Sequence, residues 1–250
     1  MFKAVTKDPK LLRDSIDIIS QLLDDGLFKL RKDGIELLAS DRAMVSVVDF
    51  KLKATSFESY ECDKDKIIGI NLLNFLTVLK RVNSNDKLTL NLNEAESKLE
   101  ISLEGDSVRN FAIPLIEISK EEIPQVDQLE FIASAELRAD ILEQGISDAD
   151  IIADSVVIEL SDDKLRMFSE GNSSKSELRL EKGNEALLSL SAKEKVKSRY
   201  SLEYLKKMIK GSKIADKTKI MIGKDYPMKI EFKGENALLN FVLAPRVAED

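Results

Sequence analysis

The sequence predicts an α+β protein of two similar domains, each with two helices packed on antiparallel sheet. Four segments repeat apolar residues at a spacing of three to four, which is typical of helices buried on one side. Short alternating segments between them predict antiparallel strands. The order of elements occurs twice, and each half ends on an apolar run closed by proline, FAIPL at 111–115 and FVLAP at 241–245. We therefore divide the chain into a domain at 1–117, a connector at 118–129 and a domain at 130–250.

The first half contains two predicted helices. Leu12, Ile16 and Ile19 belong to an apolar stripe over 9–23, and a second stripe covers 72–82. A hairpin is predicted around the turn Lys32-Asp33-Gly34, because Asp-Gly favours the tight turns that join antiparallel strands. The further predicted strands are MVSVVDFKLKA, 67–71, KLTLNLN, KLEISLE and VRNFAIPL.

The second half repeats this arrangement. Helices are predicted at 135–147 and 201–211, with the strand FIASA before the first of them and a hairpin around Asp162-Asp163. The remaining predicted strands are SELRLEK, ALLSLSA, KIMIG, PMKIEFK and ALLNFVLAP. A period of roughly 120–130 residues indicates a duplicated domain, because solenoid repeats are far shorter.

Composition excludes several classes of active site. The chain of 250 residues has no histidine and one cysteine, so it contains no Ser-His-Asp triad, no histidine zinc site and no CxxC site. It also lacks the GxxxxGK[ST] and GxGxxG phosphate-binding motifs. Its acidic groups are spread over predicted turns and helix ends, which favours solvated or capping roles over a two-metal site. These groups are Asp24-Asp25, Asp148/Asp150/Asp154 and Asp162-Asp163.

The sequence indicates a soluble protein of a reducing, cytoplasmic compartment. No apolar run reaches the ~20 residues of a membrane-spanning helix, and the N-terminus has no apolar signal segment. Cys62 has no second cysteine with which to form an internal disulfide.

Basic residues collect on the polar side of the second helix in each half. These are Lys80 and Arg81 in the first half, and Lys206, Lys207 and Lys210 in the second. The net charge is −7, so binding to nucleic acid requires such a segregated basic face. Lysines on an outer helix face are ordinarily solvated surface. The same bias in two equivalent helices weakens this interpretation but does not decide against it.

Three stretches resemble the proliferating cell nuclear antigen family of sliding clamps, in its archaeal form. They are GIELLASDRAMVSVVDFKLKATSF at 34–57, CDKDKIIGINLLNFLTVLK at 62–80 and LAPRVAED at 243–250. The resemblance covers the whole chain and implies a ring of three chains around duplex DNA, with helices lining the hole. It implies partners that include polymerase, clamp loader, flap endonuclease and ligase, and a location at the nucleoid. It implies no catalysis, no cofactor and no metal.

The resemblance also implies three sets of site residues. The residues implied to contact DNA phosphates, independently of base sequence, are Arg13, Lys80, Arg81, Arg138, Lys206, Lys207, Lys210 and Lys213. The residues implied to line a groove for partner peptides are Ser40, Met44, Val45, Val47, Ile123, Pro124, Pro227, Val242, Ala244, Pro245, Arg246 and Val247. The joint between chains is implied to form between the edge strands 107–116 and 174–182. The residues implied to lie at this joint are Arg109, Glu177, Arg179 and Glu181.

Two other functions remain open at this point. The chain could be one subunit of a heterotrimeric or checkpoint-type clamp. It could also be a carboxylate-based metal nuclease that acts on DNA, although the spread of its acidic groups disfavours this.

Overall fold

The computed structural model describes residues 1–119 and 126–246, and these residues form two compact units. Unit 1 consists of Met1–Arg42, Val48–Ile123 and Gly234–Leu239. Unit 2 consists of Ala43–Val47, Pro124–Lys233 and Asn240–Asp250. Among the described residues no helix is long and apolar enough to cross a membrane.

Nine strands and two α-helices occur in the first half of the chain, up to residue 119. In order they are β1 (Phe2–Thr6), α1 (Lys10–Ile19), β2 (Asp25–Arg31), β3 (Gly34–Ser40), β4 (Ser46–Lys53), β5 (Ser59–Cys62), β6 (Lys66–Asn71), α2 (Leu72–Leu79), β7 (Lys87–Asn93), β8 (Lys98–Glu104) and β9 (Val108–Pro114). A 3₁₀ turn at Ala54–Ser56 lies between β4 and β5.

The second half, from residue 126 to residue 246, has the same order after a 3₁₀ turn at Val126–Gln128. Its elements are β10 (Ala133–Arg138), α3 (Ala139–Asp150), β11 (Ser155–Leu160), β12 (Lys164–Glu170), β13 (Lys175–Glu181), β14 (Leu187–Ala192), β15 (Val196–Ser201), α4 (Leu202–Met208), a 3₁₀ turn at Ile209–Lys213, β16 (Lys217–Ile222), β17 (Met228–Lys233) and β18 (Ala237–Leu243).

Strand order repeats between the halves as well. The first half contains the orders β5-β1-β7-β8-β9 and β4-β3-β2-β6, and the second contains β14-β10-β16-β17-β18 and β13-β12-β11-β15. The pairings are antiparallel wherever their register is known. The predicted fold class, two similar α+β domains, is therefore confirmed.

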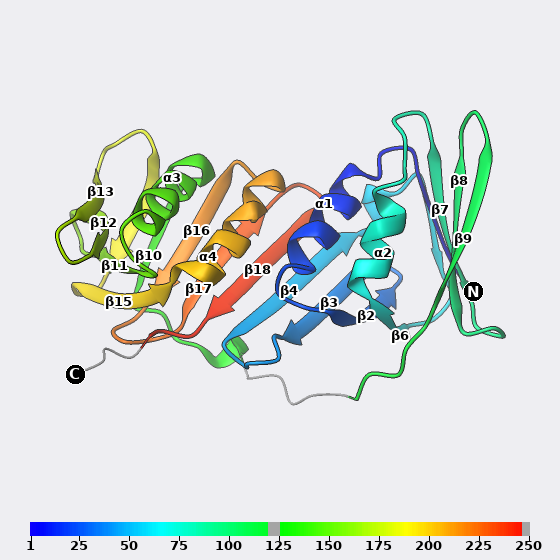
Figure 1. Ribbon diagram of the computed structural model, residues 1–250, viewed down its shortest axis with the longest axis horizontal. Coiled ribbons are helices and arrows are strands. Elements are labelled where there is room, and N and C mark those ends of the chain that lie inside the picture. The colour runs from blue at the N-terminus through cyan, green and yellow to red at the C-terminus, as the bar shows by residue number, and fades with distance from the viewer. Residues whose placement is uncertain (120–125, 247–250) are drawn as a thin grey trace. The chain divides into compact units, whose positions relative to one another are not determined.

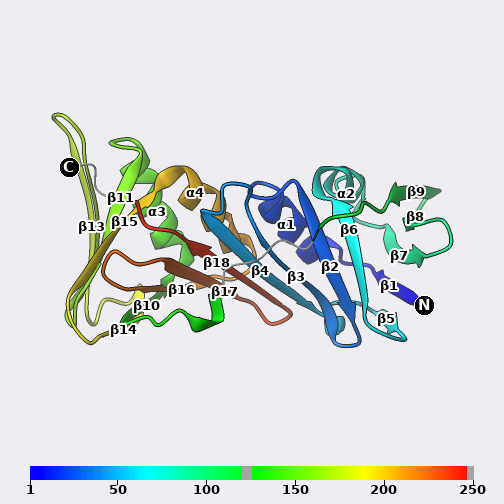
Figure 2. The same ribbon diagram turned by 90° about the horizontal axis from the view of Figure 1, so that it is seen from below.

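The helices of each unit lie together on one side of that unit's strands (Figures 1 and 2). In unit 1, α1 contacts α2, and in unit 2, α3 contacts α4. Their apolar stripes are buried, with Ile16, Ile19, Leu72 and Leu79 each 0% exposed. Burial of a large aliphatic side chain contributes roughly 1.5–3 kcal/mol, so these stripes fix each helix on its sheet.

The duplication extends to single backbone hydrogen bonds. The N–H of Leu72 donates to the carbonyl of Asp24, and the N–H of Leu202 donates to the carbonyl of Asp154, both at 2.9 Å. Both residues of the second bond lie 130 positions after their counterparts (24 to 154 and 72 to 202). The two halves therefore share one backbone framework, although few of their side chains agree.

The elements differ from the sequence predictions mainly at their ends. Helix α1 ends at Ile19 because the next residues form turns, and Leu22 N–H donates to the Ile19 carbonyl at 3.0 Å. Helix α3 begins at Ala139, since residues up to Arg138 pair with β14 and β16 as strand β10. Three short strands were not predicted, β1, β5 and β15.

Candidate partner-binding and DNA-binding surfaces

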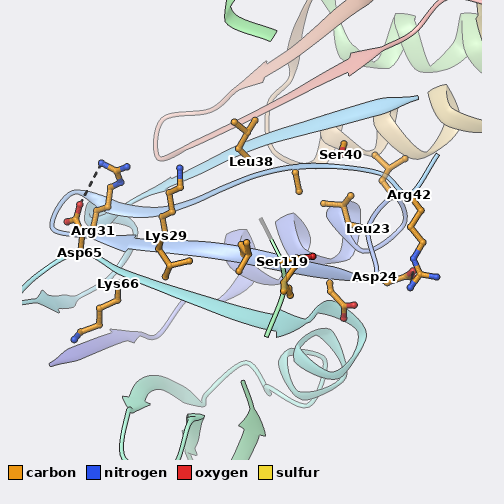
Figure 3. A pocket seen from close by; sticks show the side chains of 17 residues that line it. Leu23, Asp24, Lys29, Arg31, Leu38, Ser40, Arg42, Asp65, Lys66 and Ser119 are labelled. Carbon is orange, nitrogen blue, oxygen red and sulfur yellow. Dashed lines mark ion pairs between the residues drawn. The ribbon is translucent and has the colours of Figure 1, made fainter. Parts of the chain in front are cut away.

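Unit 1 contains a pocket of about 560 Å³ on the face of its sheet that is formed by β2, β3 and β6. Side chains that alternate along these strands line it, because every second residue of a strand points to the same face. Its apolar lining includes Leu27 from β2, Leu38 from β3 and Ile67 from β6. Ile118 and Ser119, at the start of the connector, form another wall (Figure 3).

The segment before the connector is held against the edge of β6. The N–H of Ile116 donates to the carbonyl of Gly69 at 3.0 Å. A Cβ atom at Gly69 would lie 2.2 Å from the Ile116 carbonyl oxygen and 3.2 Å from Cγ1 of Ile118. Glycine at this position therefore allows the close approach that places Ile118 on the pocket.

We expect Gly69→Ala to lower the free energy of unfolding by about 1–3 kcal/mol, because the added methyl group displaces residues 115–118 from β6. Urea unfolding followed by circular dichroism measures this change. Ile67→Ala is the control, since Ile67 is 52% exposed and its change leaves the backbone approach intact. Equal stability of Gly69→Ala and the wild type would contradict this account of the pocket wall.

Charged side chains stand at both ends of the pocket (Figure 3). At one end Arg42 forms an ion pair of 3.0 Å with Asp24, and at the other Arg31 lies 3.8 Å from Asp65. Lys29 also lines the pocket and has no carboxylate partner within the described residues. The pocket therefore offers an apolar centre between two polar ends, which suits an amphipathic peptide segment.

Lys66 lies at the edge of this pocket, but its charge is already satisfied. Its Nζ atom donates a hydrogen bond of 2.6 Å to Glu94 and lies 3.7 Å from Asp63. The hydrogen bond raises the pKa of the Lys66 ammonium group and lowers the pKa of the Glu94 carboxyl group. Lys66 therefore ties β6 to the β7–β8 turn, and Lys29 is the cation available to a ligand.

The structure places the predicted groove residues in different units. Ser40 is buried and lines the unit 1 pocket. Ile123, Pro124 and Val247 lie outside the described residues. The other predicted residues belong to unit 2: Met44, Val45, Val47, Pro227, Val242, Ala244, Pro245 and Arg246.

Within unit 2, the segments around Val45 and Ala244 lie side by side and form a wall. The N–H of Ala244 donates to the carbonyl of Val45 at 2.9 Å, and Met44 is 50% exposed beside it in the sequence. Arg246 forms an ion pair of 2.7 Å with Asp154, and this contact holds the pKa of the Asp154 carboxyl below its usual range. Val47 and Val242 are buried, so they do not face a ligand directly.

Several pocket residues were not predicted from the sequence. Leu27, Leu38 and Ile118 stand at positions where the alternation of the strands or the connector predicts an outward side chain. The feature that could have indicated the pocket is an apolar residue at an outward position of a strand. It can be recognised only once the register of β2 and β3 is known.

The predicted basic residues of the helices are mostly exposed and paired with nearby carboxylates. Lys80 contacts Asp17 at 3.1 Å across α1 and α2, and Lys206 contacts Asp150 at 2.9 Å across α3 and α4. The other pairs are Lys207 with Glu203 at 3.2 Å, Arg13 with Asp14 at 3.4 Å, and Arg138 with Asp140. Exposed ion pairs contribute only ~0–1 kcal/mol, so a phosphate group can replace the carboxylate.

Four of these lysines lie in two consecutive elements of unit 2. Lys206 and Lys207 lie in the last turn of α4, and Lys210 and Lys213 lie in the 3₁₀ turn that continues it. Lys210 and Arg81 form no ion pair within the described part of the chain. Arg138 stands at the end of β10, just before α3. This concentration of positive charge at a helix C-terminus is the strongest on any described helix.

The predicted joint residues lie on two edge strands, as the sequence predicted. Strand β9 ends one sheet and β13 ends another. Arg109 of β9 already binds within its own chain, since its guanidinium donates to the buried carboxylate of Asp86 and, at 3.0 Å, to the carbonyl of Arg81. On β13, Glu177 pairs with Arg166 at 2.7 Å and Arg179 with Glu181 at 3.2 Å. A contact between chains at these residues stays a prediction.

Metal-ligating side chains do not converge in the described residues. Across 1–119 and 126–246, no group of three or more aspartate, glutamate or cysteine side chains is placed to hold a metal ion.

Comparison with known protein families accounts for both halves. Residues 1–122 match the model described as proliferating cell nuclear antigen, N-terminal domain, and residues 125–247 match the C-terminal domain of the same family. The chain belongs to the proliferating cell nuclear antigen family. The family resemblance stated from the three sequence stretches is thereby confirmed.

Relatives of this chain extend over its full length. It is 34% identical over 249 residues to DNA polymerase sliding clamp 1 of Thermococcus kodakarensis, with 99% of each chain covered. It is 34% identical over 250 residues to the DNA polymerase sliding clamp of Pyrococcus abyssi, again with 99% of each covered. A crystal structure of PCNA from Thermococcus kodakaraensis, tk0582, has a TM-score of 0.89 at 29% identity, with 98% of this chain and 100% of that chain covered.

Proposed function

We propose that this chain is a DNA polymerase sliding clamp, which encircles duplex DNA and tethers a polymerase and other replication and repair enzymes to it. The observation that carries the proposal is the full-length similarity to archaeal proteins named as DNA polymerase sliding clamps, with both family domains matched. The cationic end of α4 and the apolar pocket of unit 1 supply the two kinds of surface that such a protein needs.

Ring formation is proposed to use the two open edges β9 and β13. An edge strand presents unpaired N–H and C=O groups, and a head-to-tail contact between unlike edges closes a ring when the rotation fits. The strand orders support this, because each half carries the same two sheets. We propose three copies of the chain per ring, which gives six similar domains.

DNA binding is proposed to be independent of base sequence. Lysine and arginine contacts to phosphates carry no sequence information, which is what sliding requires. The eight predicted residues are exposed or half-buried, and none of them is committed to the hydrophobic core.

Partner enzymes are proposed to bind through short peptides with apolar and aromatic anchors. The unit 1 pocket supports this, because its apolar centre suits such an anchor and its charged ends suit the flanking polar residues. The wall of unit 2 around Ala244 is proposed as a second surface for these peptides.

The proposal predicts that the protein is held on DNA by topology. We expect a native mass of three times the chain mass of 28.1 kDa at micromolar concentration. After loading by the clamp loader of the same cell, the protein should remain on nicked circular duplex through gel filtration and leave once the circle is cut by a restriction enzyme. Labelled protein in the DNA fractions measures this retention.

Two outcomes would contradict the proposal. Equal retention on circular and linear DNA would show ordinary binding without encirclement. A persistent monomer at micromolar concentration would show that this chain alone does not close a ring, and that a ring would need other subunits.

A further inference from the structure

In the described part of the chain, α3 and α4 cover one face of the four-stranded sheet of unit 2, and no helix covers the other. Helix α3 packs on β11, β12 and β13. Its Gly145 is so close to the sheet that an added Cβ would lie 3.0 Å from the sulfur of Met167 and 3.3 Å from Leu178. Because successive strand residues point to opposite faces, Arg166 and Arg179 point away from α3.

Charged residues dominate the face opposite α3, which we call the outer cationic face. It carries seven cations against five carboxylates, although the whole chain has a net charge of −7. The cations are Lys164, Arg166, Lys175, Arg179, Lys195, Lys197 and Arg199, and the carboxylates are Glu159, Glu170, Glu177, Glu181 and Asp163, which pairs with Lys164 at 3.3 Å from the preceding turn. A face of this charge attracts an anionic ligand against the repulsion of the rest of the protein.

The register of the strands aligns these charges into a row. Lys197 of β15 pairs in register with Glu159 of β11, Glu159 with Arg166 of β12, and Arg166 with Arg179 of β13. Neighbouring strands lie about 4.8 Å apart, so the row crosses the sheet at close spacing. A hollow of about 310 Å³ lies here, lined by Glu159, Arg166 and Arg179 together with Lys164, Glu177 and Lys195.

The buried carboxylate in this row is neutralised, which leaves the surrounding cations to face solvent. Glu159 is 5% exposed and pairs with Lys195 at 3.1 Å. Lys197 has no carboxylate partner within the described residues. Arg199 donates from Nη1 to the hydroxyl of Ser155 at 3.2 Å and forms no ion pair in the described part of the chain. The remaining ion pairs of the face are solvent-exposed, so an incoming carboxylate can exchange with them.

The first half shows that the shared framework does not require these cations. The positions 130 residues earlier are Glu36 for Arg166, Asp65 for Lys195 and Ile67 for Lys197. In unit 1 the same face is the apolar pocket, and in unit 2 it is cationic. The fold therefore does not require cations on this face.

We propose that the outer cationic face binds an extended acidic peptide segment of a partner protein. Lys195 directly precedes β15, and Lys197 and Arg199 lie in it. Alternate residues of an extended chain lie about 6.6–6.8 Å apart, and this is also their spacing in an extended peptide. A segment with a carboxylate at every second residue therefore matches the face. The proposal does not require the clamp function. It does share Glu177, Arg179 and Glu181 of β13 with the proposed joint between chains, whereas Lys164, Lys195, Lys197 and Arg199 lie outside that strand.

Nucleic acid fits this face less well than an acidic peptide. Single-stranded nucleic acid is bound by cations together with open aromatic rings on which bases stack. The face has one aromatic side chain, Phe168, and the guanidinium of Arg166 lies over its ring at 4.2 Å. Four glutamates interrupt the positive charge, and a peptide can avoid them where a continuous phosphate backbone cannot.

The test uses the variant Lys164→Gln/Lys195→Gln/Lys197→Gln. Glutamine at 195 can still donate a hydrogen bond to Glu159, so this variant should keep its fold. The control is Lys32→Gln/Lys64→Gln/Lys233→Gln, which removes the same charge from three exposed lysines elsewhere. The probe is a fluorescein-labelled peptide of five Glu-Ser repeats, followed by fluorescence anisotropy at low salt, with a labelled 20-residue oligothymidylate as the second probe.

We expect the wild type and the control to bind the peptide equally, and the face variant to bind it roughly tenfold more weakly, as the loss of three exposed charge contacts to the peptide implies. Backbone amide signals of residues 164–168 and 195–199 should shift in NMR spectra as the peptide is added. Equal peptide affinity of the two variants would overturn the proposal. A loss of oligothymidylate binding larger than the loss of peptide binding would also overturn it, because the face would then be a nucleic-acid site.

Discussion

Replacing Lys206, Lys207 and Lys210 with glutamate should lower retention on circular DNA and polymerase stimulation by about 100-fold, while the ring still assembles. These lysines lie at the C-terminal end of α4 and in the turn after it, and none is buried. Each reversal removes one attraction to a phosphate and adds one repulsion, and the three copies of the proposed ring would multiply the effect. The dependence of binding on salt concentration should become weaker as well.

The matched control is Lys32→Glu/Lys64→Glu/Lys233→Glu, which changes the net charge by the same amount. Native mass and thermal unfolding show whether each variant still folds and assembles. The exposed pairs of Lys206 with Asp150 and Lys207 with Glu203 contribute little to stability, so both variants should remain folded. Equal stimulation by the two variants would show that the α4 lysines do not face DNA.

Ala244→Asp should weaken the binding of a labelled partner peptide with apolar and aromatic anchors by roughly 30- to 100-fold, without loss of retention on circular DNA. Ala244 is half-buried, and its N–H is bonded to the Val45 carbonyl. A carboxylate there must either lose water or keep the peptide anchor away from the wall. Fluorescence anisotropy with the labelled peptide measures the affinity.

Leu38→Asp tests the same peptide at the pocket of unit 1. Leu38 is a half-buried apolar side chain of that pocket. If the pocket receives an anchor of the peptide, replacing Leu38 with aspartate should lower the affinity for the peptide. The matched control is Leu188→Asp, which makes the same change at an exposed leucine of β14 that lines neither surface. If both Leu38→Asp and Ala244→Asp bind the labelled peptide as tightly as the wild type, the partner peptide does not bind at either surface.

The helices and most strands could be predicted because the spacing of their apolar residues can be recognised in the sequence. The stripe of Leu12, Ile16 and Ile19 gives α1, and the alternation in KLTLNLN gives β7. The missed strands β1, β5 and β15 are short, and their partners are distant in the chain. For example, β1 pairs with β5 and β7, so no local pattern shows that Phe2–Thr6 belongs to a sheet.

The site could be predicted less completely than the fold. The lysines of α4 follow from helical spacing, because a helix places residues three and four apart on one side. The pocket depends on Gly69, which lets residues 115–118 approach β6, and a lone glycine in a strand does not reveal what approaches it. The cationic row depends on the register of four strands, which the sequence of any one of them does not fix.

The bond between Ile116 and Gly69 recurs 130 residues later between Arg246 and Arg199, at 2.7 Å. The backbone hydrogen bond is thus common to both units, although Arg199 carries a side chain where unit 1 has Gly69. Because the anchoring is backbone to backbone, it does not depend on the exposed side chains around it. The same backbone arrangement therefore presents an apolar pocket in unit 1 and a cationic face in unit 2.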